Sequence, residues 1–137
     1  MKGDVNKAAV GFAKAVRLEP TYVDARQNLG VAYMHQGRLA AAEKELAKAV
    51  KMAQGGMGYE QQRLAAAKAS LARANSPEEQ NAVRKEISVA QQAGNAATGK
   101  YRRGMEFLRS VQARRGETPA PYSYVVSSLS DGTTTRT

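Results

Sequence analysis

Residues 20–54 read PTYVDARQNLGVAYMHQGRLAAAEKELAKAVKMAQ and decide the fold. Apolar residues recur at helical spacing over residues 23–36 and again over residues 39–53. Gly37 separates the two stretches, at a position where a tight turn needs a residue that tolerates a left-handed backbone. Pro20 precedes them and cannot continue a helix that ends before it. The stretch therefore predicts a helical hairpin.

The second helix of this hairpin has a counterpart earlier in the chain. Residues 11–18 read GFAKAVRL and residues 45–52 read ELAKAVKM, an offset of 34 residues. Gly3 and Ala8 stand at the same offset from Gly37 and Ala42. A period of this length is typical of helical repeat proteins, in which each hairpin packs on the next. The sequence therefore contains one whole repeat preceded by half of another.

One order of residues identifies the kind of repeat. Its packing positions, after Leu29, are Gly30, Tyr33, Gly37, Ala42, Leu46 and Ala49. This order and spacing resemble the tetratricopeptide repeat, with about one and a half repeats in residues 3–54. The resemblance implies that Gly30 and Ala42 let two helices cross closely, and that Tyr33 and Leu46 fill the space between hairpins.

Two positions depart from the family's pattern. Arg26 stands where an aromatic residue is common, and Gln54 stands where proline is common. The missing first helix of the leading repeat predicts an apolar end face at Val5, Ala9, Val10 and Phe12. Two explanations account for such a face. The sequence is part of a longer repeat protein, or copies of the chain stack end to end and cover it.

The remaining residues predict further helices that do not align with the repeat. Glycines at 55, 56 and 58 predict a break, followed by helices over residues 59–74, 77–93 and 100–115. Ser76 and Glu79 form a capping-box pattern at the start of the middle helix. The expected architecture is therefore all-α, with tetratricopeptide-like repeats in residues 3–54, additional or capping helices in residues 55–115 and an extended tail in residues 116–137.

The tail has strand-like content and no second strand with which to pair. We expect it either to be disordered or to dock on a neighbouring molecule. The candidate docking residues are Tyr122, Tyr124, Val125 and Val126.

The sequence contains few candidate residues for catalysis or metal binding. The chain has no cysteine, and His35 is its one histidine, so thiol nucleophiles, histidine triads and histidine metal clusters are not expected. We expect no cofactor and no catalytic residues.

No apolar run approaches the roughly 20 residues that span a bilayer. No secretory signal is visible at Met1, and the absence of cysteine is compatible with the cytosol and with an exported bacterial protein.

Two candidate binding surfaces remain. The resemblance implies a partner-binding groove along the first helix of the hairpin, lined by Asp24, Gln27, Asn28, Val31 and His35. In some relatives this groove grips a terminal carboxylate, but Gln27 and Val31 stand where that clamp has Lys and Asn. The second surface is a basic patch in a chain of net charge +9, and it comprises Lys100, Arg102, Arg103, Arg109, Arg114 and Arg115.

Three functions follow from these features. The first is a scaffold or adaptor that binds a protein partner through the groove. The second is a structural subunit that assembles with copies of itself into an oligomer or filament, with the tail docking on a neighbour. The third is a basic nucleic-acid-binding protein whose binding weakens steeply with salt.

Overall fold

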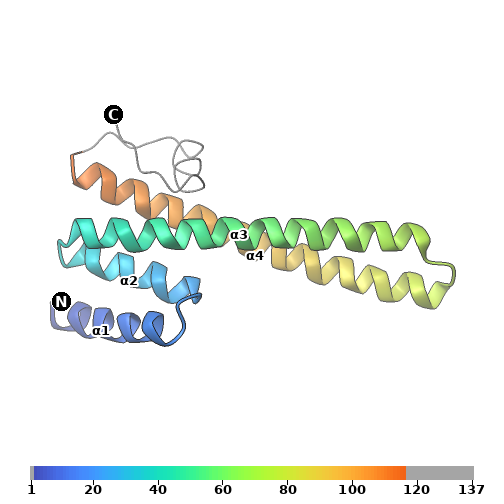
Figure 1. Ribbon diagram of the computed structural model, residues 1–137, viewed down its shortest axis with the longest axis horizontal. Helices are drawn as coiled ribbons and strands as arrows, with labels where there is room; N and C mark the ends of the chain where they lie inside the picture. Colours follow the sequence, from blue (N-terminus) through green and yellow to red (C-terminus); the bar gives the residue numbers. More distant parts are fainter. Residues whose placement is uncertain (1, 117–137) are drawn as a thin grey trace.

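The computed structural model describes residues 2–116, which form four helices and no strand. They are α1 (Lys2–Leu18), α2 (Val23–His35), α3 (Leu39–Arg73) and α4 (Pro77–Arg114). Figure 1 shows α1, α2, the first part of α3 and the last part of α4 side by side, with the rest of α3 and α4 projecting together. We call residues 2–53 and 100–116 the body and residues 54–99 the arm. The predicted all-α class is confirmed.

The α2–α3 hairpin turns at Gly37. Its φ of 78° lies in the left-handed region, which favours glycine. The N–H of Gly37 donates to the carbonyl of Met34, and the N–H of Arg38 donates to that of Tyr33, so carbonyls at the end of α2 are satisfied. The guanidinium of Arg38 lies 4.4 Å from the centre of the Tyr33 ring. Gly37 therefore forms the turn between α2 and α3, as the sequence predicts.

Small residues bring α2 and α3 together beside this turn. Ala42, Leu46 and Ala49 are fully buried. A Cβ atom built on Gly30 would lie 2.6 Å from Cγ of Leu46, closer than carbon atoms approach without a shift. Gly30 is therefore at the helix crossing that the repeat pattern predicts.

Helix α1 packs on α2 as the second half of a preceding repeat would. Ala9 is buried against Leu29 and Ala32, with Val5 and Phe12 half-buried beside them. The far side of α1 is open, since Val10 is 71% exposed. The expected bare end face is therefore narrower than the sequence suggested, because α2 covers most of its apolar residues.

The helix breaks predicted after residue 54 and near residues 94–99 are wrong. α3 runs unbroken through Gly55, Gly56 and Gly58, and α4 runs unbroken through Gly94 and Gly99. A glycine inside a helix costs about 1 kcal/mol relative to alanine, which continuous packing along both helices offsets. The three predicted distal helices are thus parts of two long ones, and the division of the chain at residue 54 stays a prediction.

The packing that carries both helices through the glycines is a heptad seam. Buried or half-buried residues recur at alternating spacings of four and three, the repeat of a coiled coil. On α3 they are Leu46, Val50, Ala53, Met57, Glu60, Leu64, Ala67 and Leu71. On α4 they are Gln80, Val83, Ile87, Ala90, Gly94, Ala97, Tyr101, Gly104, Leu108 and Val111. The pattern crosses from arm to body without interruption, which explains why neither helix ends at the junction.

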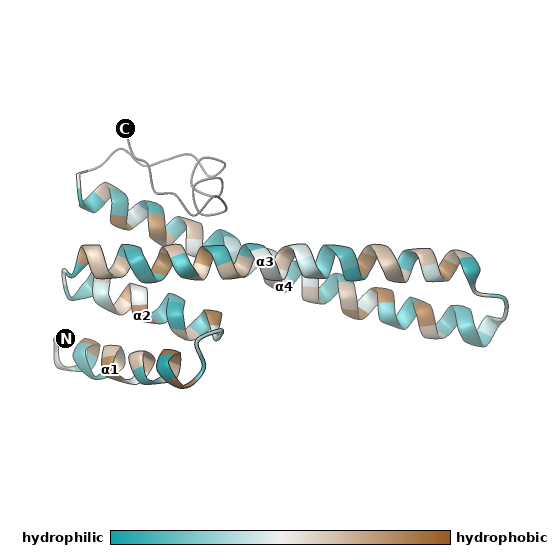
Figure 2. Ribbon diagram, viewed as in Figure 1, coloured by the Kyte–Doolittle hydropathy of each residue, from teal (hydrophilic) through white to brown (hydrophobic). Residues whose placement is uncertain are grey.

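The last part of α4 returns to the body and closes the core. Met105, Leu108 and Val111 are buried with Met34 and Leu46 in one apolar cluster. Figure 2 shows polar and apolar residues interspersed along this segment. α4 therefore covers the open side of the α2–α3 hairpin, as a terminal helix of a repeat stack must.

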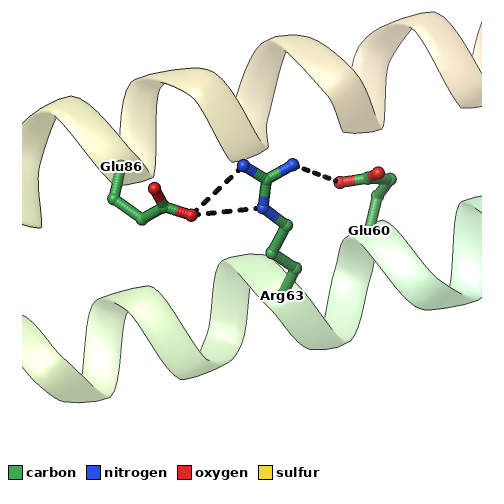
Figure 3. A network of polar contacts seen from close by, with 3 residues as sticks. All are labelled: Glu60, Arg63 and Glu86. Atoms are coloured by element: carbon green, nitrogen blue, oxygen red, sulfur yellow. Dashed lines mark hydrogen bonds and ion pairs between the residues drawn. The ribbon is translucent and has the colours of Figure 1, made fainter.

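A polar contact ties the two arm helices together midway along their length. Arg63 on α3 donates to the Glu86 carboxylate on α4 at 3.2 Å, and it also pairs with Glu60 at 3.5 Å (Figure 3). The hydrogen bond to Glu86, followed by the attraction of both carboxylates, raises the pKa of Arg63 above its ordinary value. Glu60 occupies a seam position, where a charged residue favours one register over its alternatives.

The tip of the arm is fixed by a cap at the start of α4. Ser76 Oγ accepts a hydrogen bond from the N–H of Glu79, and the Glu79 carboxylate accepts one from the N–H of Asn75. We expect Ser76→Ala to reduce the stability of the arm by about 1 kcal/mol. Hydrogen exchange of the amides of residues 79–81 measures this loss. Ser70→Ala, in the exposed interior of α3, is the matched control and should not speed that exchange.

Candidate partner-binding surface

The exposed side of α2 presents three of the predicted groove residues in one row. Asn28 and His35 are exposed and Val31 is half-buried, at spacings of three and four that place them on one helix face. Asn28 offers an amide that both donates and accepts hydrogen bonds, as a peptide backbone requires. These three side chains are accessible to solvent along one face of α2.

The other two predicted groove residues contact α4. Gln27 is 4% exposed, and its side-chain amide donates to the Lys100 carbonyl at 2.9 Å. The Asp24 carboxylate pairs with the Lys100 ammonium at 3.5 Å, and both side chains remain partly open to solvent. Gly104 makes this approach possible, because a Cβ there would lie 3.1 Å from both Gln27 and Val50. The two residues thus position α4 beside α2.

Helix α4 consequently contributes a second row to the same surface. Phe107 and Arg114 follow Lys100 at intervals of seven residues, so they share the side of α4 on which Lys100 meets α2. Phe107 is half-buried, and Arg103 and Arg114 are exposed. We call this the α2–α4 surface, and it comprises Asn28, Val31, His35, Lys100, Arg103, Phe107 and Arg114.

The sequence pattern of α2 alone does not reveal the α4 half of this surface. Gln27 and Lys100 are 73 residues apart, and no local signal relates them. The seven-residue spacing of Lys100, Phe107 and Arg114 was the available clue. It shows which residues share a side of α4, but not that this side lies against α2.

The structure divides the predicted basic patch. Lys100 pairs with Asp24, and Arg115 pairs with Glu43 at 2.6 Å. Arg102, Arg103 and Arg114 are exposed, and Arg109 is half-buried. Consecutive helical residues point about 100° apart, so Arg102 and Arg103 face different directions. The patch is therefore not one continuous basic face. The tail residues Tyr122, Tyr124, Val125 and Val126 lie outside the described residues.

Within residues 2–116, no group of three His, Asp or Glu side chains could hold a metal ion. None of the described helices is long and apolar enough to cross a membrane.

Comparison with known proteins identifies a family that the first part of the chain matches. A family model described as tetratricopeptide repeat matches residues 1–56. No curated protein and no solved structure matches the chain. The matched residues include α1, α2, the turn at Gly37 and the part of α3 that crosses Gly30. Residues 1–56 therefore carry the helical-repeat fold of the tetratricopeptide repeat family.

Proposed function

We propose that this protein is a scaffold or adaptor that binds a protein partner at the α2–α4 surface without catalysing a reaction. The observation that carries this proposal is the pairing of α4 with α2, which sets exposed polar and basic groups beside Val31 and Phe107. The repeat family provides the general expectation of a protein partner.

The chemistry of this surface indicates the kind of segment that fits it. Asp24 carries the nearby negative charge and is paired with Lys100, whereas Arg103 and Arg114 are exposed. An acidic segment would gain charge-assisted hydrogen bonds from these guanidinium groups. Val31 and Phe107 favour apolar side chains in the same segment. A clamp for a terminal carboxylate receives no support, because Gln27 is buried and bound to α4.

A peptide-binding experiment tests the surface. An array of peptides that alternate acidic and apolar residues serves as the probe, and the tightest binder is titrated in solution. We expect Arg103→Glu to weaken its binding about tenfold, which corresponds to about 1.4 kcal/mol. The loss comes from exchanging an attractive charge for a repulsive one.

Arg102→Glu is the matched control for this experiment. It makes the same charge change at the neighbouring exposed position, which faces away from α2. Equal losses for the two variants would show that binding follows net charge and would contradict the proposed surface. NMR shifts confined to residues outside α2 and the last part of α4 would contradict it as well.

The two alternative functions receive less support from the described residues. End-to-end stacking requires an apolar face at each end of the body, and the outward side of α4 carries Arg102, Glu106 and Ala113. Nucleic-acid binding would use the basic patch. Two of its residues, Lys100 and Arg115, already pair with carboxylates of the body. The adaptor is therefore the function that the geometry favours.

A further inference from the structure

One side of the arm carries exposed apolar side chains. Tyr59 is 66% exposed and precedes Arg63 by four residues, so the two share a side of α3. Val89 is 50% exposed and follows Glu86 by three residues on α4. Because Arg63 and Glu86 bind each other across the seam, Tyr59 and Val89 lie on the same side of the arm. We call this side the arm face.

The arm buries too little apolar surface to be well packed by itself. Its buried residues are Ala67 and Ala90, both small. Leu64, Val83 and Ile87, which are larger, are half-buried along the seam. A two-helix unit of this size normally needs further packing from outside, because alanine contributes little buried area. Another pair of helices laid on the arm face would supply that area.

The distribution of charge indicates which partner can approach the arm. The described body carries fifteen Lys and Arg against six Asp and Glu, a net charge of +9. The arm carries five Lys and Arg against four Glu, a net charge of +1. Two copies of this chain repel each other through their bodies, but not through their arms. A second copy can therefore meet the first along the arm.

The two ends of the arm face complement each other in an antiparallel arrangement. Leu18 is 74% exposed and Tyr22 is 47% exposed, and they flank the turn between α1 and α2. Figure 1 shows this turn at the end of the body from which the arm projects. Arg17 lies in the last turn of α1 and Glu78 in the first turn of α4 at the arm tip, and both are exposed. Glu19 lies beside Arg17 at the turn, and Arg73 lies at the arm tip with Glu78, so each end carries both signs of charge and an antiparallel neighbour can pair opposite charges there.

We propose that two copies of this chain dimerise by packing their arm faces antiparallel, forming a four-helix bundle with the two bodies at opposite ends. Each arm helix is about 30 Å long and about 10 Å wide, so two faces bury roughly 1,200 Å² in total. This area is at the lower end of stable interfaces, which predicts a dimer that dissociates on dilution. The antiparallel order keeps the charged bodies about one arm length apart. This dimer does not depend on the α2–α4 surface, so either proposal can fail without the other.

Sedimentation equilibrium of the full chain tests the dimer. We expect the mass to rise from one chain to two as the concentration increases through the micromolar range, and Tyr59→Glu with Val89→Glu to hold it at one chain. Val10→Glu is the matched control, because Val10 is also an exposed valine on a helix but lies on α1. A wild-type mass of one chain at high concentration overturns the proposal. A dimer lost with Val10→Glu and kept with the arm variant overturns it too.

Cross-linking determines the direction of the two arms. The chain has no cysteine, so a single introduced thiol is unique. Ala66 lies near the middle of the arm part of α3 and Ser70 lies nearer its tip, and both are exposed. In an antiparallel dimer, a short bismaleimide should link Ala66→Cys to itself and leave Ser70→Cys unlinked. Linking of both variants to the same extent indicates parallel arms and overturns the arrangement.

Discussion

Replacing Gly30 with leucine is expected to lower the free energy of unfolding by about 3 kcal/mol. The added side chain begins with a Cβ atom 2.6 Å from Leu46 Cγ and 2.8 Å from its Cδ2. The carbonyl oxygen of Ala42 lies 3.4 Å from the same point, so the side chain cannot turn freely toward α3. Leu46 is fully buried and has no open space to enter. The two helices must therefore separate.

Urea unfolding followed by circular dichroism measures this loss. Gly11→Ala is the control, because a Cβ there meets nothing within 4 Å and alanine favours a helix by about 1 kcal/mol over glycine. Leu46→Ala should destabilise the wild type but cost less in the Gly30→Leu background, where the leucine fills the space that it vacates. Strict additivity of the two changes would show that Gly30 and Leu46 do not meet.

The hairpin could be predicted because its determinants are local. Gly37 supplies the left-handed turn and Gly30 the close crossing, and both lie within the repeat that specifies them. The neighbouring Ala42 and Leu46 complete the contact a few residues later. Each of these residues favours the same backbone conformation. The family pattern and the helical periodicity therefore predict the same hairpin.

The arm could not be predicted in the same way, because tertiary packing overrides its local signals. The glycines at 55, 56 and 58 indicate a break when each helix is considered alone. The heptad seam that carries α3 through them depends on α4, which returns only after the turn at residues 74–76. Once the two helices are paired, each glycine costs far less than the packing that loss of the helix would forfeit.

The α2–α4 surface could be predicted only in part, for a related reason. Asp24 and Gln27 have the polar character of groove residues, and only the return of α4 reveals that they contact Lys100. Phe107 and Arg103 belong to a helix that does not match the repeat, so the family pattern assigned them no role. Long-range pairing therefore determines which predicted groove residues remain accessible and which residues of α4, among them Arg103 of the predicted basic patch, lie beside them.

Arg26 departs from the aromatic residue that is common at its position in the repeat, and the structure shows what replaces it. Its Nη1 donates to Glu45 at 2.9 Å, and its Nη2 donates to the carbonyl of Pro20 at 2.9 Å. The side chains of Arg26 and Glu45 are 9% and 17% exposed, so the pair is largely shielded from water. An ion pair thus joins α2 to α3 where aromatic packing would otherwise do so.

Glu45→Ala is expected to destabilise the protein by about 3 kcal/mol, because it leaves the Arg26 guanidinium buried without its counter-charge. Nε of Arg26 is already buried without a hydrogen-bond partner, so the group has little means of compensation. Removing both charges together should cost much less. Arg26→Leu with Glu45→Leu fills the same space with apolar groups, and we expect its stability to lie within about 1 kcal/mol of wild type. Urea unfolding of both variants provides the comparison. A double variant as unstable as Glu45→Ala would mean that the ion pair itself, rather than the cost of an unpaired charge, holds α2 and α3 together.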